Sequence, residues 1–271
     1  SEESGMARTT KTPAKKAVPA KAAAAAAPVV DGPAVLTERR GHLLIVTLNR
    51  PEARNAVNGD LAQAMEAILD DFEADDAITV VIITGRGPTF CAGADLKDMA
   101  AARMRAMQGG DDGTDPIAEV NARFGRMCAA FAHSPLAVVA VLEGTVMGGG
   151  FGLACVADVA IASETASFRL PETALGVVPA QIAPFLVERL GYSQAKRLAV
   201  TGGRLDAAAA LRIGLVHQQV AAAQLQAALD GVLGDILACA PGALAATKAL
   251  MAKARLQEPA SLVDEAAAIF S

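Results

Sequence analysis

The sequence is poor in aromatic residues. It contains no Trp, one Tyr and eight Phe among 271 residues, although 53% of the chain is hydrophobic. With so few large rings, the core must be filled mainly by Ala, Val, Leu and Ile. We therefore expect small, closely packed helices and strands around a core that a chain of this length can readily bury.

The chain also lacks an apolar run long enough to cross a bilayer. A spanning helix needs roughly 18 to 20 apolar residues in succession, and Gly, Pro or a charged residue interrupts every candidate run. The formal net charge of −5 supplies no basic field for nucleic acid. We expect a soluble, cytoplasmic protein with no membrane partner, and nucleic acid is not an expected partner of its folded part.

Cysteine is scarce and scattered. The four Cys residues form no CxxC pair and have no partnering His close in sequence; they are Cys91, Cys128, Cys155 and Cys239. This pattern favours buried free thiols in a reducing compartment over disulfides or metal ligands. We therefore expect no metal site.

Residues 1–33 differ in composition from everything that follows. They are a mixture of Thr, Lys, Pro and Ala that cannot bury a core, and SEESG before Met6 is typical of a tag remnant. We predict a disordered, solvated tail. Its lysines leave open a contact with nucleic acid or an anionic surface, and its shortage of acids is also similar to a transit peptide.

From residue 34 the pattern is that of alternating strands and helices. A strand at 42–51, a helix capped by Asn58 and a strand at 78–84 form one crossover. A polar, glycine-rich stretch at 108–116 is typical of a mobile loop, and a helix follows at 117–132. The last third has helix-forming composition, with segments at 193–200, 206–213, 221–239, 242–256 and 261–270.

Two glycine-containing turns stand out. In residues 135–158 a buried strand at 138–142 is followed by Gly148-Gly149-Gly150 and a helical run, and in residues 90–99 a small-residue turn feeds another helix. The first N–H groups of a helix are unpaired donors at its positive end. Neither turn matches GxGxxG or a P-loop, and the triple-glycine turn contains no Lys. The pattern therefore indicates a developing oxyanion rather than a phosphate.

With both turns placed, residues 35–271 resemble the crotonase, or enoyl-CoA hydratase/isomerase, superfamily. The matching blocks, in order, are LNRPEARNAV, FCAGADLKDM, LEGTVMGGGFGLACVAD, FRLPETALGVVP and TGGRLDAAAALRIGLV. The resemblance implies an α/β fold, a right-handed spiral of ββα turns over 34–205 that binds an acyl-CoA thioester. It also implies a helical C-terminal region at 206–271 used for trimerisation, giving a homotrimer or hexamer. Coenzyme A would be part of the substrate, and no other cofactor is implied.

The resemblance also assigns roles to particular residues. The oxyanion hole maps to the backbone N–H groups of Ala94 and Gly149, and the acid–base carboxylate maps to Glu172. Two such donors stabilise the charge that grows on the thioester oxygen in an enolate. The substrate-binding positions that it implies are Arg54, Ala92, Asp95, Leu96, Gly148 and Gly152.

Gly152 departs from the family pattern, because hydratases of this family carry a second glutamate at that position. Three interpretations stay open: a hydratase-type lyase that uses Glu172, a Δ3,Δ2-enoyl-CoA isomerase that needs one glutamate, and a non-catalytic acyl-CoA- or RNA-binding relative. The segment PETALGVVPAQIAPF resembles that of isohexenylglutaconyl-CoA hydratases. That resemblance implies a branched or carboxylated acyl group, for which Gly152 would leave room and with which Arg169 could pair.

Overall fold

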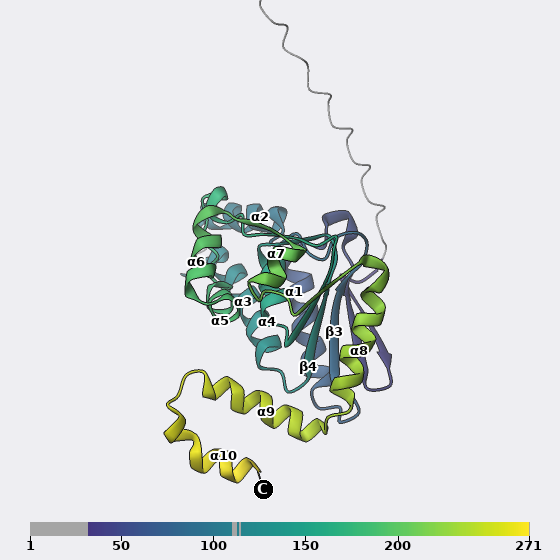
Figure 1. Cartoon of the computed structure of the whole chain (residues 1–271). Coiled ribbons are helices and arrows are strands. Elements are labelled where there is room, and N and C mark those ends of the chain that lie inside the picture. Colours follow the sequence, from purple (N-terminus) through teal and green to yellow (C-terminus); the bar gives the residue numbers. More distant parts are fainter. Residues whose placement is uncertain (1–31, 110–112, 114, 271) are drawn as a thin grey trace, which may run out of the picture.

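The computed structural model describes residues 32–109, 113 and 115–270 as a mixed α/β fold (Figure 1). The tail expected at 1–33 lies outside the described residues up to residue 31, as do 110–112 and 114 of the loop expected at 108–116. The strands are β1 (Val35–Arg40), β2 (Leu43–Leu48), β3 (Val80–Gly85), β4 (Ala137–Leu142), β5 (Thr145–Met147), β6 (Val159–Ser163), β7 (Ser167–Arg169), β8 (Arg204–Asp206) and β9 (Gln218–Val220).

Helices follow most of these strands. They are α1 (Gly59–Phe72), α2 (Leu96–Gln108), α3 (Pro116–His133), α4 (Gly149–Val156), α5 (Ala183–Leu190), α6 (Tyr192–Thr201), α7 (Ala207–Arg212), α8 (Leu225–Leu237), α9 (Pro241–Ala254) and α10 (Val263–Phe270). Short 3₁₀ turns lie at η1 (Pro51–Ala53), η2 (Thr173–Leu175), η3 (Ala222–Gln224) and η4 (Pro259–Leu262).

The larger sheet has six strands in the order β1-β2-β3-β4-β6-β9, and only the β1–β2 pair is antiparallel. The central strand β4 is apolar at every position, and β3 is apolar over residues 80–83, because both faces of the sheet are covered. Val81 and Ile83 of β3 face the core under α1, α3 and α4, whereas Val80 and Ile82 face the core under α8. Figure 1 shows these helices on opposite sides of β3 and β4.

The predicted crossover and helix starts are confirmed. β2 and β3, which precede and follow α1 in the sequence, pair in parallel. The Asn58 side chain is the N-cap of α1 and accepts a hydrogen bond from Leu61 N. Asp95 and Asp115 cap α2 and α3 in the same way. The strands β1, β8 and β9 were not predicted. β8 and β9 have three residues each, too few to show a period of two.

The expected strand, glycine turn and helix at 138–156 is wrong in one respect. Between β4 and α4 the chain forms the short strand β5, which leaves the large sheet and pairs with β7 in a second sheet, β5-β7-β8. Gly144, with φ of +60°, makes the change of direction, and a side chain there would collide with Pro88 O. β5 leads into α4, which contacts both β4 and β5.

The eight-residue helix α4 is buried almost throughout, and a side chain from α5 binds its C-terminal end. Arg189 Nη2 donates to the carbonyl oxygens of Ala154 and Cys155, at 3.2 and 2.9 Å, and also to Ala157 O. These carbonyls have no donors within the helix. Burial lowers the pKa of Arg189, but its positive charge lies at the negative end of the α4 dipole.

The last two helices extend beyond the sheet and the helices that cover it (Figure 1). Lys248 of α9 ties them to the body, because its Nζ donates to Leu136 O and to Asp158 Oδ2, each at 2.6 Å. α9 and α10 contain no buried residue. Large apolar side chains remain exposed on this region, among them Met251, Leu256, Val263 and Phe270. The helical C-terminal region is therefore present, with an apolar surface.

The thiol prediction is confirmed for three cysteines. Cys91, Cys128 and Cys155 are buried and free, and burial raises the pKa of Cys91 and Cys155 to about 12. It is wrong for Cys239, which is free but exposed. In the described ranges no single helix is long and apolar enough to span a membrane; one helix pair, Ala222–Leu237 with Pro241–Ala254, bent by 96°, passes that test only jointly.

Arg189 allows a direct stability test. Arg189→Met leaves three carbonyls at the end of α4 without their donor, and we expect the free energy of unfolding to fall by about 2–4 kcal/mol in urea titrations. Arg189→Lys keeps the charge but not the planar fork of the guanidinium, so its free energy of unfolding should lie between those of Arg189→Met and the wild type. The matched control is Arg197→Met on α6, where the Arg197 side chain donates to Gln194 at the surface. Equal losses for Arg189→Met and Arg197→Met would contradict this account.

Candidate active site

Two backbone segments from distant parts of the chain meet beside α4. Cys91 N donates to Thr145 O at 3.1 Å, and Met147 N donates to Cys91 O at 3.0 Å. These bonds form an isolated parallel bridge between Cys91 and Val146. The turn that leads into α2 therefore lies directly against the turn that leads into α4, as the two-turn prediction requires.

Glycine is needed here because the two turns approach so closely. Gly93 has φ of +96°, and a Cβ on it would lie 2.8 Å from Met147 O. A Cβ on Gly150 would lie 2.4 Å from Cys91 O, and one on Gly149 would lie 2.9 Å from the Phe124 ring. A real Cβ does not make contacts this short. The triple glycine is thus a packing requirement of the site.

The arrangement leaves two N–H groups free. Val57 N donates to Gly93 O at 2.7 Å and Asp95 N donates to Val57 O at 3.0 Å. Along an extended segment alternate residues turn their N–H groups to opposite sides, so the Ala94 N–H points away from Val57. Gly149 N is the first N–H of α4 and has no partner within the helix. In the described ranges neither N–H has an acceptor.

Glu172 supplies a carboxylate close to these donors. It precedes η2, and its carbonyl accepts from Leu175 N and Val177 N at 3.0 Å each, which holds its backbone. A Cβ on Gly148 would lie 3.0 Å from Glu172 Oε1, so the carboxylate lies against the α4 turn. Glu172 Oε2 is buried without a hydrogen-bond partner. Burial raises the pKa of Glu172, while its own backbone N–H acts in the opposite direction.

These groups share one cavity of about 580 Å³. Of the predicted site residues, Ala94, Asp95, Gly149 and Glu172 line it. Much of the remaining wall is apolar and comes from α1, α3 and the segment before α5, including Val57, Ala62, Ile117, Val120, Phe124, Val177, Val178 and Ile182. Such a cavity has the composition of a small-molecule site.

The other predicted residues do not line this cavity. Arg54 donates to Thr145 Oγ1 at 3.2 Å, and Ala92 N bonds to Arg54 O at 3.0 Å. Leu96 begins α2 with 75% of its surface exposed. Gly148 lies against the Glu172 carboxylate and forms the turn before α4, with φ of +55°. A role for these residues in binding coenzyme A or the acyl chain stays a prediction.

The space expected beside Gly152 does not exist. Gly152 is buried within α4, and a Cβ there would lie 2.3 Å from Ile182 Cγ2. Ile182 therefore fills the place into which a side chain at 152 would grow, and it presents an apolar wall to the cavity. The expectation that Gly152 leaves room for a branch is wrong for this reason.

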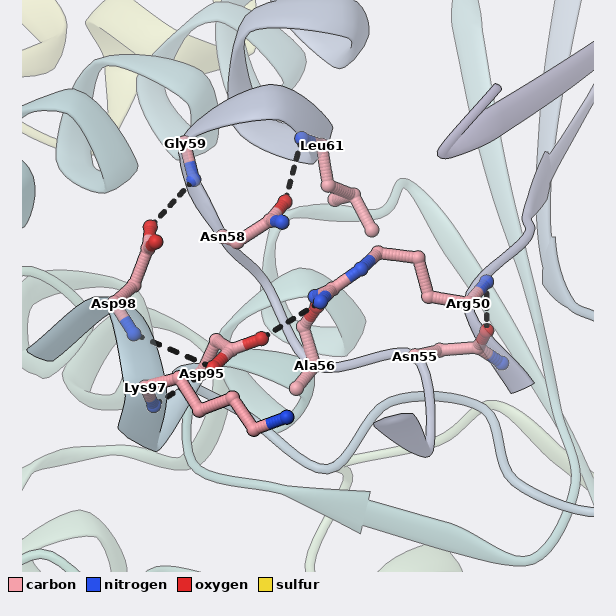
Figure 2. A network of polar contacts seen from close by, with 9 residues as sticks. All are labelled: Arg50, Asn55, Ala56, Asn58, Gly59, Leu61, Asp95, Lys97 and Asp98. Carbon is pink, nitrogen blue, oxygen red and sulfur yellow. Dashed lines mark hydrogen bonds and ion pairs between the residues drawn. The ribbon is translucent and has the colours of Figure 1, made fainter. Parts of the chain in front are cut away.

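The remaining carboxylates of the cavity wall are engaged elsewhere. Asp98 Oδ2 accepts from Gly59 N at 2.7 Å, at the start of α1 (Figure 2). Asp115 Oδ1 accepts from Ile117 N at 2.9 Å, at the start of α3. Asp95 Oδ1 accepts from Lys97 N at 2.8 Å, and its Oδ2 binds Arg50 at 2.7 Å. In the described part of this wall, Glu172 is the carboxylate with an unpartnered buried oxygen.

The Arg50–Asp95 pair shows what the LNRPEARNAV block does. Arg50 donates to Ala56 O and Asp95 Oδ2, and Arg50 N donates to Asn55 Oδ1 at 2.9 Å (Figure 2). Burial acts to raise the pKa of Asp95, but the Arg50 hydrogen bond and the two α2 N–H groups outweigh it, so the pKa is lowered. Asp95 is therefore a charged cap that fixes the loop carrying Ala94.

Several residues that pattern analysis did not single out belong to this site. Phe124, Asn121, Gln181 and Ile182 line the cavity. Nothing in the local sequence marks Asn121 and Phe124, whereas Gln181 and Ile182 lie within the segment PETALGVVPAQIAPF. Arg50 and Asn55 do stand within a motif block, which was a usable signal. Among the described residues no group of three or more His, Cys, Asp or Glu is placed to hold a metal ion.

The geometry has a definite chemical capacity. Two free backbone donors can accept a developing oxyanion, and one partly buried carboxylate with a raised pKa can take up and return a proton nearby. Both functions act at one apolar cavity that can exclude much of the bulk water. The arrangement is suited to proton transfer next to an activated carbonyl group.

Comparisons with known proteins agree with this geometry. The family model described as enoyl-CoA hydratase/isomerase matches residues 38–270. A probable enoyl-CoA hydratase of Rhizobium meliloti is 37% identical over 81% of this chain and 79% of its own length. The crystal structure of an enoyl-CoA hydratase/isomerase from Marinobacter aquaeolei has a TM-score of 0.84 and 45% identity, covering 88% of this chain and 89% of its own.

A further solved structure is similar and contains a ligand. A putative enoyl-CoA hydratase from Thermobifida fusca, in complex with acetoacetyl-CoA, has a TM-score of 0.77 and 31% identity, and the match covers 87% of this chain and 92% of its own. The expected crotonase-type α/β fold is confirmed by these matches.

The glycine contacts allow a paired test. Gly150→Ala places a methyl group 2.4 Å from Cys91 O, which is backbone and cannot yield, so we expect a loss of more than about 2 kcal/mol in unfolding free energy. Gly231→Ala, at an exposed position of α8 with nothing within 4 Å of the added Cβ, should instead stabilise the protein by about 0.5–1 kcal/mol. Thermal unfolding measures both. A neutral Gly150→Ala would show that the two turns are not in close contact.

Proposed function

The chain belongs to the enoyl-CoA hydratase/isomerase family and is an enzyme of that family, and from this premise we propose that it is a hydratase-type lyase that adds water to a 2-enoyl-CoA thioester. The observation that carries the proposal is the single unpartnered carboxylate oxygen of Glu172 in the cavity that also contains the free N–H groups of Ala94 and Gly149. A thioester carbonyl bound to these donors would present its α- and β-carbons inside an apolar cavity.

In this proposal Glu172 acts twice. As carboxylate it takes a proton from water while the hydroxyl group adds to the β-carbon, and the electron pair of the double bond moves to form an enolate. The N–H groups of Ala94 and Gly149 stabilise the enolate oxygen. The protonated Glu172 then returns its proton to the α-carbon, so that one water is added in all. A raised pKa suits a group that must both accept and donate a proton.

The position of Ile182 favours a second function, isomerisation of an enoyl-CoA. This side chain closes the region in which a second carboxylate at 152 would hold water. A Δ3,Δ2-enoyl-CoA isomerase needs no water: Glu172 would remove a proton from the α-carbon of a 3-enoyl thioester and return it to the γ-carbon as the double bond moves. The same two N–H groups would stabilise the intermediate dienolate. The apolar wall supports this alternative.

The finer features of the substrate and assembly are also proposals. A branched or carboxylated acyl group rests on the resemblance of PETALGVVPAQIAPF. In the described ranges Arg169 forms no ion pair and its Nε is buried without a partner, but Arg169 does not line the cavity, so its pairing with an acyl carboxylate rests on the resemblance alone. The exposed apolar residues of α9 and α10 support association into a homotrimer or hexamer. A cytoplasmic location fits an enzyme that uses coenzyme A thioesters.

A non-catalytic relative is the alternative from another class. Its RNA-binding form rests on the tail expected at residues 1–33, of which residues 1–31 lie outside the described part of the chain. Against it stands the cost of Glu172, because a buried carboxylate oxygen without a partner destabilises a fold and has no structural use. Deleting residues 1–33 separates the two: unchanged turnover of acyl-CoA supports the enzyme.

Glu172→Gln tests the acid–base role. We expect kcat on a 2-enoyl-CoA to fall about 100- to 10,000-fold with little change in KM, because the amide keeps the shape but transfers no proton. The raised pKa of Glu172 means that its ionised form weakens the fold: the stability is fully present below the ordinary pKa of a glutamate and is lost as pH rises from there through the raised pKa. The melting temperature of Glu172→Gln at neutral pH should therefore be unchanged or higher.

Two further readouts complete this test. The kcat/KM of the wild type should rise with pH through a midpoint above the ordinary range of a glutamate, because the base must be ionised. Glu143→Gln, which changes a carboxylate outside the cavity, should leave kcat unchanged. If Glu172→Gln retains full activity, or loses activity only together with stability, the assignment is wrong.

Substrate choice separates hydratase from isomerase. Purified protein is incubated with a 2-trans-enoyl-CoA and, separately, with a 3-enoyl-CoA of the same chain length, and the thioester products are separated. Hydration of the 2-enoyl substrate, detected as the 3-hydroxyacyl thioester, is the expected result. Formation of the 2-enoyl thioester from the 3-enoyl substrate, with no hydration of either, would reject the hydratase and establish the isomerase.

A further inference from the structure

We propose that the amide pair Asn121–Gln181 in the cavity wall binds a hydrogen-bond-accepting oxygen on the acyl group, so that the enzyme selects acyl chains bearing a carboxylate or carbonyl oxygen over plain hydrocarbon chains. This inference rests on the proposed function, since it names the substrate class of the same cavity. It is carried by the contacts of these two side chains.

The two amides come from different elements and meet at the cavity. Asn121 belongs to α3, and Gln181 precedes α5. Gln181 Nε2 donates to Asn121 Oδ1 at 2.8 Å, and both residues are half-buried and line the cavity that contains Glu172. A hydrogen bond between residues 60 positions apart holds the segment 176–182 against α3 at this point.

The Gln181 amide packs against Gly125 of α3, where no Cβ is present. A Cβ on Gly125 would lie 2.0 Å from Gln181 Oε1 and 2.6 Å from its Cδ. The Gln181 amide therefore packs directly on the backbone of α3, one helical turn from Asn121. Because Oε1 lies on this helix, Nε2 is the end directed to Asn121. A side chain at 125 would displace the pair.

The direction of this hydrogen bond determines what Asn121 can offer a ligand. Its Oδ1 is already used as an acceptor, so its unused groups are the two N–H donors of Nδ2. In the described ranges no acceptor is bonded to Nδ2. A ligand that satisfies it must bring an acceptor: a carboxylate, ester or ketone oxygen fulfils this, and a methyl group does not.

The surroundings make such a contact selective. Phe124, Val177 and Ile182 line the same cavity and offer no polar side-chain group. When a hydrocarbon chain displaces water from this wall, the Asn121 donors lose their water partners and gain none, which is unfavourable. A site that contains hydrogen-bonding groups rejects analogues without the matching group more strongly than an apolar site rejects an added group.

The charges of the cavity do not by themselves decide between a carboxylate and a neutral oxygen. Arg123 lines the wall and forms no ion pair in the described ranges, while Asp98 and Asp115 are bound to helix N-termini. A carboxylate and a neutral carbonyl or ester group both offer an acceptor oxygen. The experiment below therefore uses one probe of each kind.

The test measures binding of saturated acyl-CoA thioesters, which cannot be hydrated. Glutaryl-CoA carries a terminal carboxylate, its monomethyl ester carries a neutral acceptor, and valeryl-CoA has the same five-carbon acyl chain without an oxygen at its end. Dissociation constants are measured by calorimetry. The wild type should bind at least one oxygen-bearing probe about 10-fold or more tightly than valeryl-CoA.

Asn121→Leu is expected to remove this preference, so that the ratio of dissociation constants falls to within about twofold of unity. Gln181→Met leaves Asn121 unoriented and should reduce the ratio in part. Gln226→Met removes an exposed amide on α8 that bonds only to Asp230 and serves as the matched control, with the wild-type ratio expected. Tighter binding of glutaryl-CoA alone identifies the carboxylate, and equal gain with the ester identifies the neutral oxygen.

Two results would overturn the proposal. One is a wild type that binds all three probes equally, and the other is an Asn121→Leu variant that is folded by circular dichroism and keeps the wild-type ratio. Because the probes report binding, these outcomes are independent of turnover. If the protein hydrates no enoyl-CoA but still shows the ratio and its loss, the proposed reaction fails while the acyl-oxygen site stands.

Discussion

The site depends on one backbone contact, the bridge between residues 91–94 and 145–150. Both turns must bring their peptide groups within bonding distance, and Gly93 and Gly150 make this possible because no Cβ fits between the chains. Each side then has one N–H without a partner, Ala94 on the first and Gly149 on the second. In the proposed function these two donors form the oxyanion site, so the site depends on close backbone packing and on the glycines that permit it, and no side chain takes part.

That contact is held from both of its ends. On the first turn, the Arg50–Asp95 pair and the Asn55 hydrogen bonds to Arg86 O and Thr89 O fix the loop before α2. On the second, Arg189 binds the far end of α4, so that a helix of only eight residues has a defined position. Backbone donors stabilise charge effectively only when they do not have to reorganise during the reaction. The geometry of the two turns is thus supported by contacts beside the first turn and at the far end of α4.

Sequence reasoning reached the parts of the structure that depend on local chemistry. Asn58 and the Asp95 region predicted helix starts, because short polar side chains bond to the first N–H groups of a helix. The β-branched run of β4 predicted a buried strand. β5, β8 and β9 were out of reach because three-residue strands exist only through their partners. The positions of Ile182, Asn121 and Gln181 were out of reach for the same reason, since they are brought to the cavity by tertiary contacts. Gly152 was noticed, but the side chain that fills its place lies thirty residues away.

The pairing of Gly152 with Ile182 changes how the single carboxylate should be understood. The absence of a glutamate at 152 could mean that a two-carboxylate site lost one member, which would leave a cavity in place of the side chain. The structure has no hole there, because Ile182 Cγ2 lies only 2.3 Å from the place that a Cβ at 152 would take. An Ile and a side chain at 152 exclude each other, so the two positions are sterically coupled and replacing either alone leaves a clash or a cavity. With Asp95, Asp98 and Asp115 committed to helix caps, the chain leaves Glu172 as the carboxylate free to move a proton. The apolar wall beside Glu172 is therefore a consistent part of the packing, and in both proposed reactions Glu172 is the group that moves the proton.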